Sequence, residues 1–237
     1  MAAGPAAAQV AATPQLPEEH DAEQAAALVR ALELHYPLTL ALLEREFPAD
    51  HAALMAVVEE IGGGEGQPVD LLLAASQQLA EVRRKYADRV VFAPGVSHPV
   101  MLGLLADFYD SVLATDGASV CGRFAHDGSA VLFELGLSGN YAGHLDRQSV
   151  AYFESVVLAI EAPEIAGALQ PEDMAVLLAA MVRAGAPPSY VAAIAGGRPN
   201  DPNLCAAYAA LFRTSGLLDS PEGARTRADF AKNLAGY

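Results

Sequence analysis

The chain has 237 residues, of which 53% are hydrophobic, and it carries a formal net charge of −15. Binding to phosphate requires a basic face, so this acidic excess argues against DNA or RNA as a partner and against an anionic membrane surface. The chain has no run of about 18 apolar residues, so we expect no direct membrane insertion.

The chain begins with MAAGPAAAQVAATPQ, a tract dominated by alanine and proline. This tract has neither the basic n-region nor the leucine-rich h-region of an intact signal peptide. We predict that residues 1–16 are a disordered tail. Tails of this kind often follow a removed signal or anchor, so we expect an exported protein, periplasmic or secreted, and leave a cytoplasmic location open.

Several prolines stand where a helix can begin. Proline fits the first helical turn because its missing N–H has no intrahelical partner there, and an acidic residue beside it meets the positive end of the helix dipole. Such proline–acid pairs occur at Pro17, Pro48, Pro68, Pro163, Pro171 and Pro221. We expect most of them to start helices.

Apolar residues recur at helical spacing through most of the chain. The predicted helices cover residues 17–35, 38–47, 48–62, 68–92, 98–115, 118–126, 144–161, 174–182, 187–196, 201–215 and 221–235. The segment 174–182 is apolar nearly all round, which is typical of a central, buried helix. Residues 127–143 are the most loop-like part of the interior, and within them residues 131–135 fit either a helical turn or a short strand. The predicted fold class is all-α, a bundle of about 8–10 helices.

A run of three glycines, Gly62 to Gly64, is the strongest break in the chain. We therefore expect a single helical domain over residues 17–237, with a candidate subdomain boundary at 62–67.

Two segments resemble each other around the two cysteines. Cys121 and Cys205 each follow an aspartate near a predicted helix start, and each has an aromatic residue three positions later, Phe124 and Tyr208. This spacing places the cysteine and the aromatic ring on one helical face. We expect a structural disulfide, with two buried free thiols as the alternative.

The sequence offers two candidate functional surfaces. A glycine-rich region holds Asn140, Tyr141, His144, Asp146 and Arg147, and binding residues favour loops held by a rigid scaffold. An ordinary helix connection is the simpler explanation of that region.

The second candidate is a basic docking patch of Arg83, Arg84, Lys85 and Arg89 near the end of a long predicted helix. Positive charge there complements the helix dipole, which is the simplest explanation. As a docking patch it suits an acidic partner or, as we prefer, the chain's own acidic N-terminal third.

No established catalytic or metal-binding pattern emerges from the sequence. The spacings HExxH, Glu-x-x-His and CxxC are absent, as are GxSxG and the lysine of a P-loop. Asp107 and Asp110 lie one turn apart, but we expect both to face solvent. We therefore predict no cofactor and no metal.

The composition and the scattered reactive residues favour a non-enzymatic protein that binds another protein. It suits an accessory subunit, an inhibitor or an immunity-type partner, with the partner unidentified. One alternative is a helical enzyme or small-molecule binder with a pocket near residues 126–147. Another is a purely structural scaffold.

Overall fold

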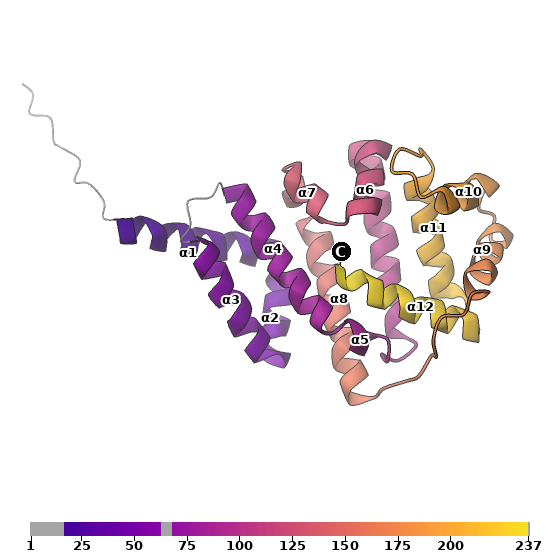
Figure 1. Ribbon diagram of the computed structural model, residues 1–237, viewed down its shortest axis with the longest axis horizontal. Coiled ribbons are helices and arrows are strands. Elements are labelled where there is room, and N and C mark those ends of the chain that lie inside the picture. Colours follow the sequence, from indigo (N-terminus) through magenta and orange to yellow (C-terminus); the bar gives the residue numbers. More distant parts are fainter. Residues whose placement is uncertain (1–16, 63–67, 237) are drawn as a thin grey trace, which may run out of the picture.

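The computed structural model describes residues 17–62 and 68–236, and every regular element within these ranges is helical (Figure 1). The α-helices are α1 (Pro17–His35), α2 (Pro37–Glu46), α3 (Pro48–Gly62), α4 (Pro68–Lys85), α5 (Ala87–Val90), α6 (Ser97–Asp127), α7 (Ala130–Glu134), α8 (Ala142–Glu161), α9 (Asp173–Arg183), α10 (Pro188–Gly196), α11 (Leu204–Leu217) and α12 (Pro221–Asn233). Two 3₁₀ helices, η1 (Ser138–Tyr141) and η2 (Leu234–Gly236), complete the described chain. The all-α prediction is confirmed.

The number of helices depends on the shortest ones. Twelve α-helices are present in the described ranges, against the 8–10 helices expected, and α5 and α7 have only four and five residues. The predicted tail (1–16) and most of the candidate subdomain boundary (62–67) lie outside the described residues.

Proline is the first residue of α1, α2, α3, α4, α10 and α12, as its fixed φ and missing N–H favour. At α12 the hydroxyl of Ser220 accepts a hydrogen bond from the backbone N–H of Gly223, which completes the helix start. Pro163 and Pro171 do not begin helices, contrary to expectation. Both lie in the irregular segment between α8 and α9.

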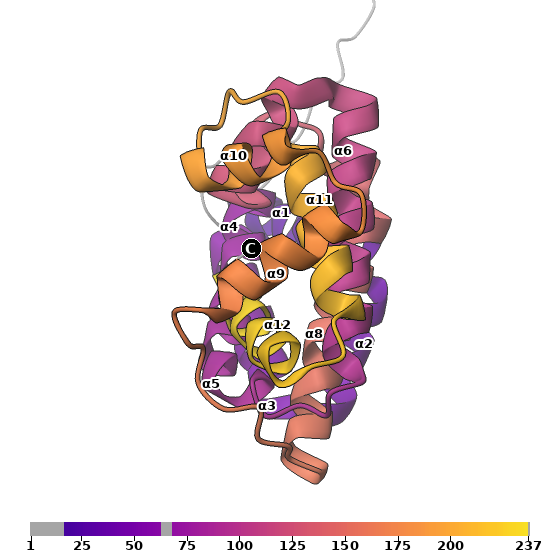
Figure 2. The same cartoon turned by 90° about the vertical axis from the view of Figure 1, so that its right-hand side faces the viewer.

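Helices α6 and α11 pack side by side through the middle of the fold (Figures 1 and 2). Cys121 of α6 and Cys205 of α11 are paired as a disulfide, with Cα atoms 6.0 Å apart. The aromatic residues that follow them meet on one ring: Phe124 lies 4.9 Å and Tyr208 lies 5.7 Å from Tyr109, measured between ring centroids. The matched sequence segments thus form two sides of one buried contact.

The structure decides one local question that the sequence left open and confirms one predicted helix break. Residues 131–134 form most of the helical turn α7, so the short-strand alternative for 131–135 is wrong, and the 3₁₀ helix η1 follows within 127–143. The predicted break between 98–115 and 118–126 is confirmed as a kink within α6, where Gly117 has φ +81°.

The expected central helix at 174–182 is instead a surface helix. Only Asp173, Leu177 and Met181 of α9 are buried, one residue per turn against α11 and α12 (Figure 2). Its other apolar side chains are partly buried, such as Met174 and Leu178, or exposed, such as Val182. The apolar composition of this segment therefore led to a wrong prediction. A narrow row of buried residues, four positions apart, is enough to pack the helix against its neighbours.

No single helix in the described ranges is long and apolar enough to cross a membrane. Together, residues 25–35 and 37–46 have the length and composition, but they meet at a bend of 97°. The leucines on their inner faces, including Leu32 and Leu43, are buried in the core.

Candidate functional site

The five residues of the glycine-rich candidate surface have divergent roles. Tyr141 is buried, and its hydroxyl donates a hydrogen bond to Asp116; burial, aided by this carboxylate, raises the pKa of the phenol to about 12. Asp146 is also buried and accepts hydrogen bonds from the backbone of α2. His144 stacks on Phe108 with ring centroids 5.2 Å apart, and partial burial lowers the pKa of its imidazole. Three of the five thus support packing.

Asn140 and Arg147 remain exposed, and the Arg147 guanidinium donates to the carbonyl of Gly143. The small cavity beneath this region measures about 20 Å³, room for about one water molecule rather than a substrate. A shallower hollow of about 280 Å³ lies between α4 and α7, and its described lining contains no histidine. These dimensions give little support to a catalytic pocket at 126–147.

The four residues of the basic docking patch are likewise dispersed. Arg83 is buried, donates to the hydroxyl of Ser149, and has its guanidinium pKa lowered by burial. Arg84 pairs with Glu81 of its own helix. Lys85 binds Asp50 of α3 at 2.6 Å, a contact with the acidic N-terminal third. Arg89 belongs to α5 and lines a surface cavity near the end of α8.

The described residues offer no metal site. Asp107 and Asp110 both bind Arg213 of α11, with N–O distances of 2.9 and 2.6 Å. Within the described ranges, no three side chains of the types His, Cys, Asp and Glu come together as a metal would require.

The most distinctive surface feature is the segment from residue 162 to 172 that joins α8 to α9, here called the strap (Figure 1). With eleven residues the strap is about twice as long as a typical connection, and loops held by a rigid scaffold often carry function. At its start the strap is fixed by two hydrogen bonds: Glu164 N donates to Phe92 O, and its carboxylate accepts from Gly95 N, both at 2.8 Å.

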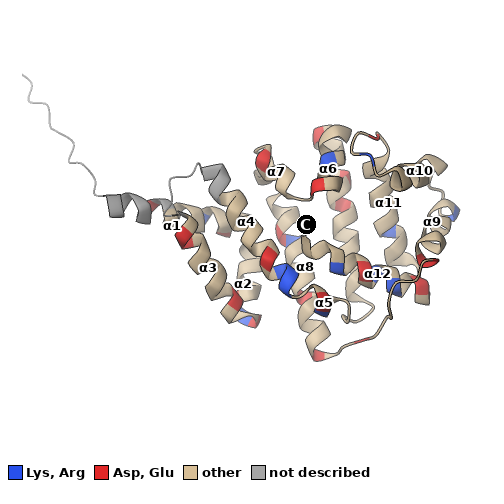
Figure 3. Cartoon of the chain, viewed as in Figure 1, with Lys and Arg blue, Asp and Glu red and all other residues tan. Residues whose placement is uncertain are grey.

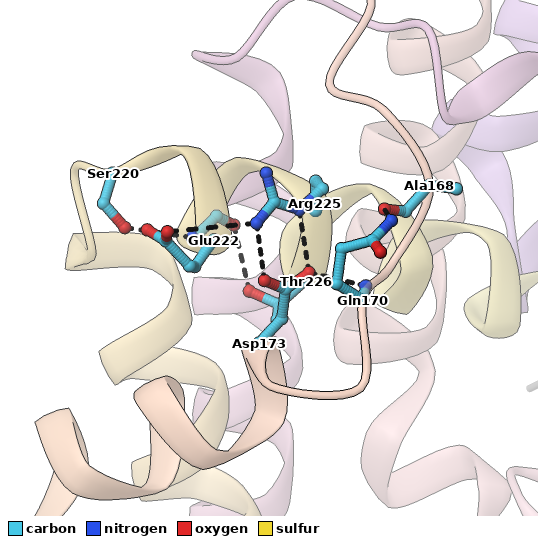
Figure 4. Close-up of polar contacts among 8 residues, drawn as sticks. Ala168, Gln170, Asp173, Ser220, Glu222, Arg225 and Thr226 are labelled. Atoms are coloured by element: carbon cyan, nitrogen blue, oxygen red, sulfur yellow. Dashed lines mark hydrogen bonds and ion pairs between the residues drawn. The ribbon is translucent and has the colours of Figure 1, made fainter.

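The end of the strap is fixed by a buried carboxylate, Asp173 (Figure 4). Arg225 of α12 donates to both oxygens of Asp173 at 2.8 and 2.6 Å, and Gln170 N donates to one of them at 2.7 Å. The Arg225 guanidinium, with help from Gln170, holds the pKa of the Asp173 carboxyl below its usual value. A two-point contact of this kind restrains both position and direction.

Between these anchors the strap presents apolar side chains to solvent. Ile165 is 85% exposed and Leu169 is 39% exposed. The backbone N–H groups of residues 165–169 make no hydrogen bond within the described part of the chain. The middle of the strap is therefore held in place from both ends but makes few stabilising contacts of its own.

Two adjoining cavities flank the strap and share Phe92 and Ile165 in their linings. One measures about 400 Å³ and lies between the strap and α12; the other measures about 630 Å³ and lies between the strap, α5 and the end of α8. Ile160 adds a further exposed apolar side chain to the second cavity. We call this combined surface the strap groove.

Charged residues border the strap groove at both cavities. Arg225, Asp229 and Lys232 line the first cavity and Arg89 lines the second. Lys232 pairs with the exposed Asp88 at 2.6 Å. The groove thus combines an apolar floor with a polar rim, the arrangement found at many protein-binding surfaces.

The sequence did not predict this site. Among the residues of the strap groove, Arg89 alone had been named as a candidate, as part of the basic docking patch. Ile165 and Leu169 lie far along the chain from Phe92, and their apolar character is usual for residues of a core. The signal available in the sequence was Pro163 and Pro171, which enclose only seven residues with a glycine among them, too short a stretch for a regular helix to be expected.

Comparison with known proteins adds no functional information: no family model, no curated protein and no solved structure matches the chain. The function therefore has to be argued from the geometry of the strap groove.

Proposed function

We propose that this protein binds an apolar segment of a partner protein in the strap groove. The observation that carries the proposal is the gathering of Phe92, Ile160, Ile165 and Leu169, all exposed, around two adjoining cavities. Exposed apolar side chains that are scattered need no explanation, but a contiguous patch with a polar rim is typical of an interaction site.

The chemistry of the groove favours binding over catalysis. Its described lining holds no histidine, cysteine or serine, and its Lys232 ammonium is paired with the Asp88 carboxylate. The Asp173 carboxylate is fully occupied in fixing the strap. The groove offers shape and apolar surface, which suit recognition.

The exposure of the groove favours a polypeptide over a small molecule. Small-molecule sites bury most of the ligand surface in a concave pocket. Here Ile165 stands 85% exposed between the two cavities, and Ile160 is 56% exposed. A protein segment is large enough to cover both side chains and to occupy both cavities at once.

An exported location is part of the proposal. The sulfur atoms of Cys121 and Cys205 lie at bonding distance, and disulfides persist mainly outside the reducing cytosol. An accessory subunit or an inhibitor acting in an oxidising compartment fits this pairing.

Selection from a displayed library of random 12-residue peptides tests the proposal. We expect wild-type protein to enrich peptides with apolar anchors, and Ile165→Asp to abolish their binding while leaving the melting temperature unchanged. Leu34→Asp is the matched control, because Leu34 is 78% exposed on α1, at the other end of the molecule. Failure to enrich any peptide, or equal binding by both variants, would refute a binding role for the groove.

A further inference from the structure

We infer that the partner segment is acidic beside its apolar anchors; this inference rests on the proposed function. The chain has 29 acidic and 14 basic side chains, yet three of the four charged side chains that line the strap groove are cations: Arg89, Arg225 and Lys232. Figure 3 shows several of the basic positions along α12. Two of these cations are already paired with a carboxylate, Arg225 with Asp173 and Lys232 with Asp88, so Arg89 is the one without a partner among the residues that the structure describes.

The three cations differ in how free they are to meet a ligand. Arg225 is committed to Asp173 and serves to fix the strap. Arg89 is exposed, and its side chain makes no hydrogen bond or ion pair with any residue that the structure describes. An unpaired guanidinium at the edge of an apolar groove is suited to a carboxylate, which it binds through two parallel hydrogen bonds.

Lys232 is paired, but loosely. Its ammonium and the carboxylate of Asp88 are 49% and 88% exposed, and exposed pairs of this kind add little to stability. A carboxylate arriving with a partner segment can replace Asp88 at little cost. Among the described residues, Asp229 is the one acidic side chain in the lining, and it accepts a hydrogen bond from Asn233.

The positions of these cations define a pattern. Lys232 lines the cavity beside α12, Arg89 lines the cavity beside α5, and Ile165 stands between them. A segment lying across Ile165 therefore meets a cation on each side of its apolar anchor. A basic segment would meet repulsion from the unpaired Arg89 and would offer no carboxylate to Lys232, so the groove favours an acidic segment.

The test uses the peptides enriched in the library selection described above. We expect them to carry more Asp and Glu than the starting library. Dissociation constants of the best peptide are then measured by fluorescence anisotropy for the wild type, for Arg89→Glu with Lys232→Glu, and for a control with Arg147→Glu and Arg183→Glu. The control makes the same charge change at exposed sites outside the groove.

We expect the groove double variant to weaken binding about tenfold or more and the control to change it less than about twofold. A version of the peptide with alanine in place of its acidic residues should bind the wild type more weakly and lose its sensitivity to the groove variant. Added salt should weaken the binding of the acidic peptide and leave the binding of the alanine version unchanged.

The outcomes separate the two proposals. The enriched peptides could be neutral or basic and lose binding with Ile165→Asp but not with the groove double variant. That result would overturn the inference of an acidic partner and leave the binding role of the groove intact. An absence of enriched peptides would overturn both. Binding to vesicles of anionic phospholipid that depends on Arg89 and Lys232, without peptide binding, would assign the cations to a lipid surface instead.

Discussion

Asp146 and Thr39 are 107 residues apart in the sequence, yet three hydrogen bonds join them. The carboxylate accepts from the Thr39 backbone N–H and hydroxyl, both at 2.8 Å, and the hydroxyl also approaches the backbone carbonyl of Asp146 at 3.2 Å. The same carboxylate accepts from Leu38 N at 3.1 Å. A residue of α8 thus caps the start of α2, a role usually filled by a local side chain.

We expect Asp146→Ala to lower the free energy of unfolding by about 2–3 kcal/mol, because it leaves two backbone donors without a partner near the core. Urea unfolding followed by circular dichroism measures this loss. Asp127→Ala is the control, since the Asp127 side chain is about half exposed and its removal should cost under about 0.5 kcal/mol. Equal losses in the two variants would contradict a capping role for Asp146.

The disulfide should make a large contribution to stability. Cys121 and Cys205 are separated by 84 positions, and closing a loop of that size in the unfolded chain corresponds to about 4–5 kcal/mol in the chain-entropy model, an upper figure. We expect dithiothreitol to lower the urea midpoint of the wild type. The same reagent should leave a Cys121→Ala, Cys205→Ala double variant unchanged. A wild type indifferent to the reductant would argue for free thiols.

Two glycines of α6 should respond in opposite ways to alanine. A Cβ atom on Gly122 would lie 1.7 Å from the carbonyl oxygen of Pro199, so Gly122→Ala requires the connection before α11 to move and should cost about 2–3 kcal/mol. A Cβ atom on Gly103 meets nothing within 4 Å, so Gly103→Ala should gain about 0.5–1 kcal/mol from helix propensity. Thermal unfolding of both variants checks the sign of each change.

His98 should make the stability depend on pH. The imidazole is buried, donates to Val90 O at 2.9 Å, and lies near Arg227 of α12 and Glu164 of the strap; burial lowers its pKa from the usual 6.5. In the unfolded chain it binds a proton at a higher pH than in the folded protein. Stability is therefore lost as pH falls below about 6.5, by at most about 1.4 kcal/mol per pH unit for this one group.

The measurement compares unfolding free energies at pH 7.5 and pH 5.5. We expect His98→Gln to shrink the difference between the two, even though the substitution lowers stability at both. The exposed His126 provides the control, and His126→Gln should leave the difference as in the wild type. An unchanged difference in His98→Gln would show that other groups set the pH dependence.

The sequence predicted most of the helices for local reasons. Proline at a helix start and glycine at a break act through their own backbones, so Pro48 and Gly117 could be interpreted without knowledge of any neighbour. The cysteine pairing was also accessible, because each cysteine shares a helical face with an aromatic ring. The exposure of α9 could not be predicted from the sequence, because its apolar faces resemble those of a buried helix. Only the placement of α11 and α12 decides which of these faces are covered.

The candidate site was largely beyond sequence reasoning. Tyr141 and Asp146 are polar residues in a glycine-rich region, which favoured a surface, but long-range partners on α6 and α2 draw both into the interior. The strap groove is made by Phe92, Ile165 and Lys232, which are brought together only by the tertiary fold. Such a site has no spacing signature along the chain.

The two anchors of the strap, at Glu164 and Asp173, lie outside residues 165–169, which line the groove between them. Changes within residues 165–169 therefore leave the surrounding helices undisturbed, provided that the turn at Gly167, with φ +85°, is kept. This arrangement separates what the loop recognises from what holds the protein together. It makes the segment a natural place to graft new sequences and so to redirect the same scaffold to a different ligand.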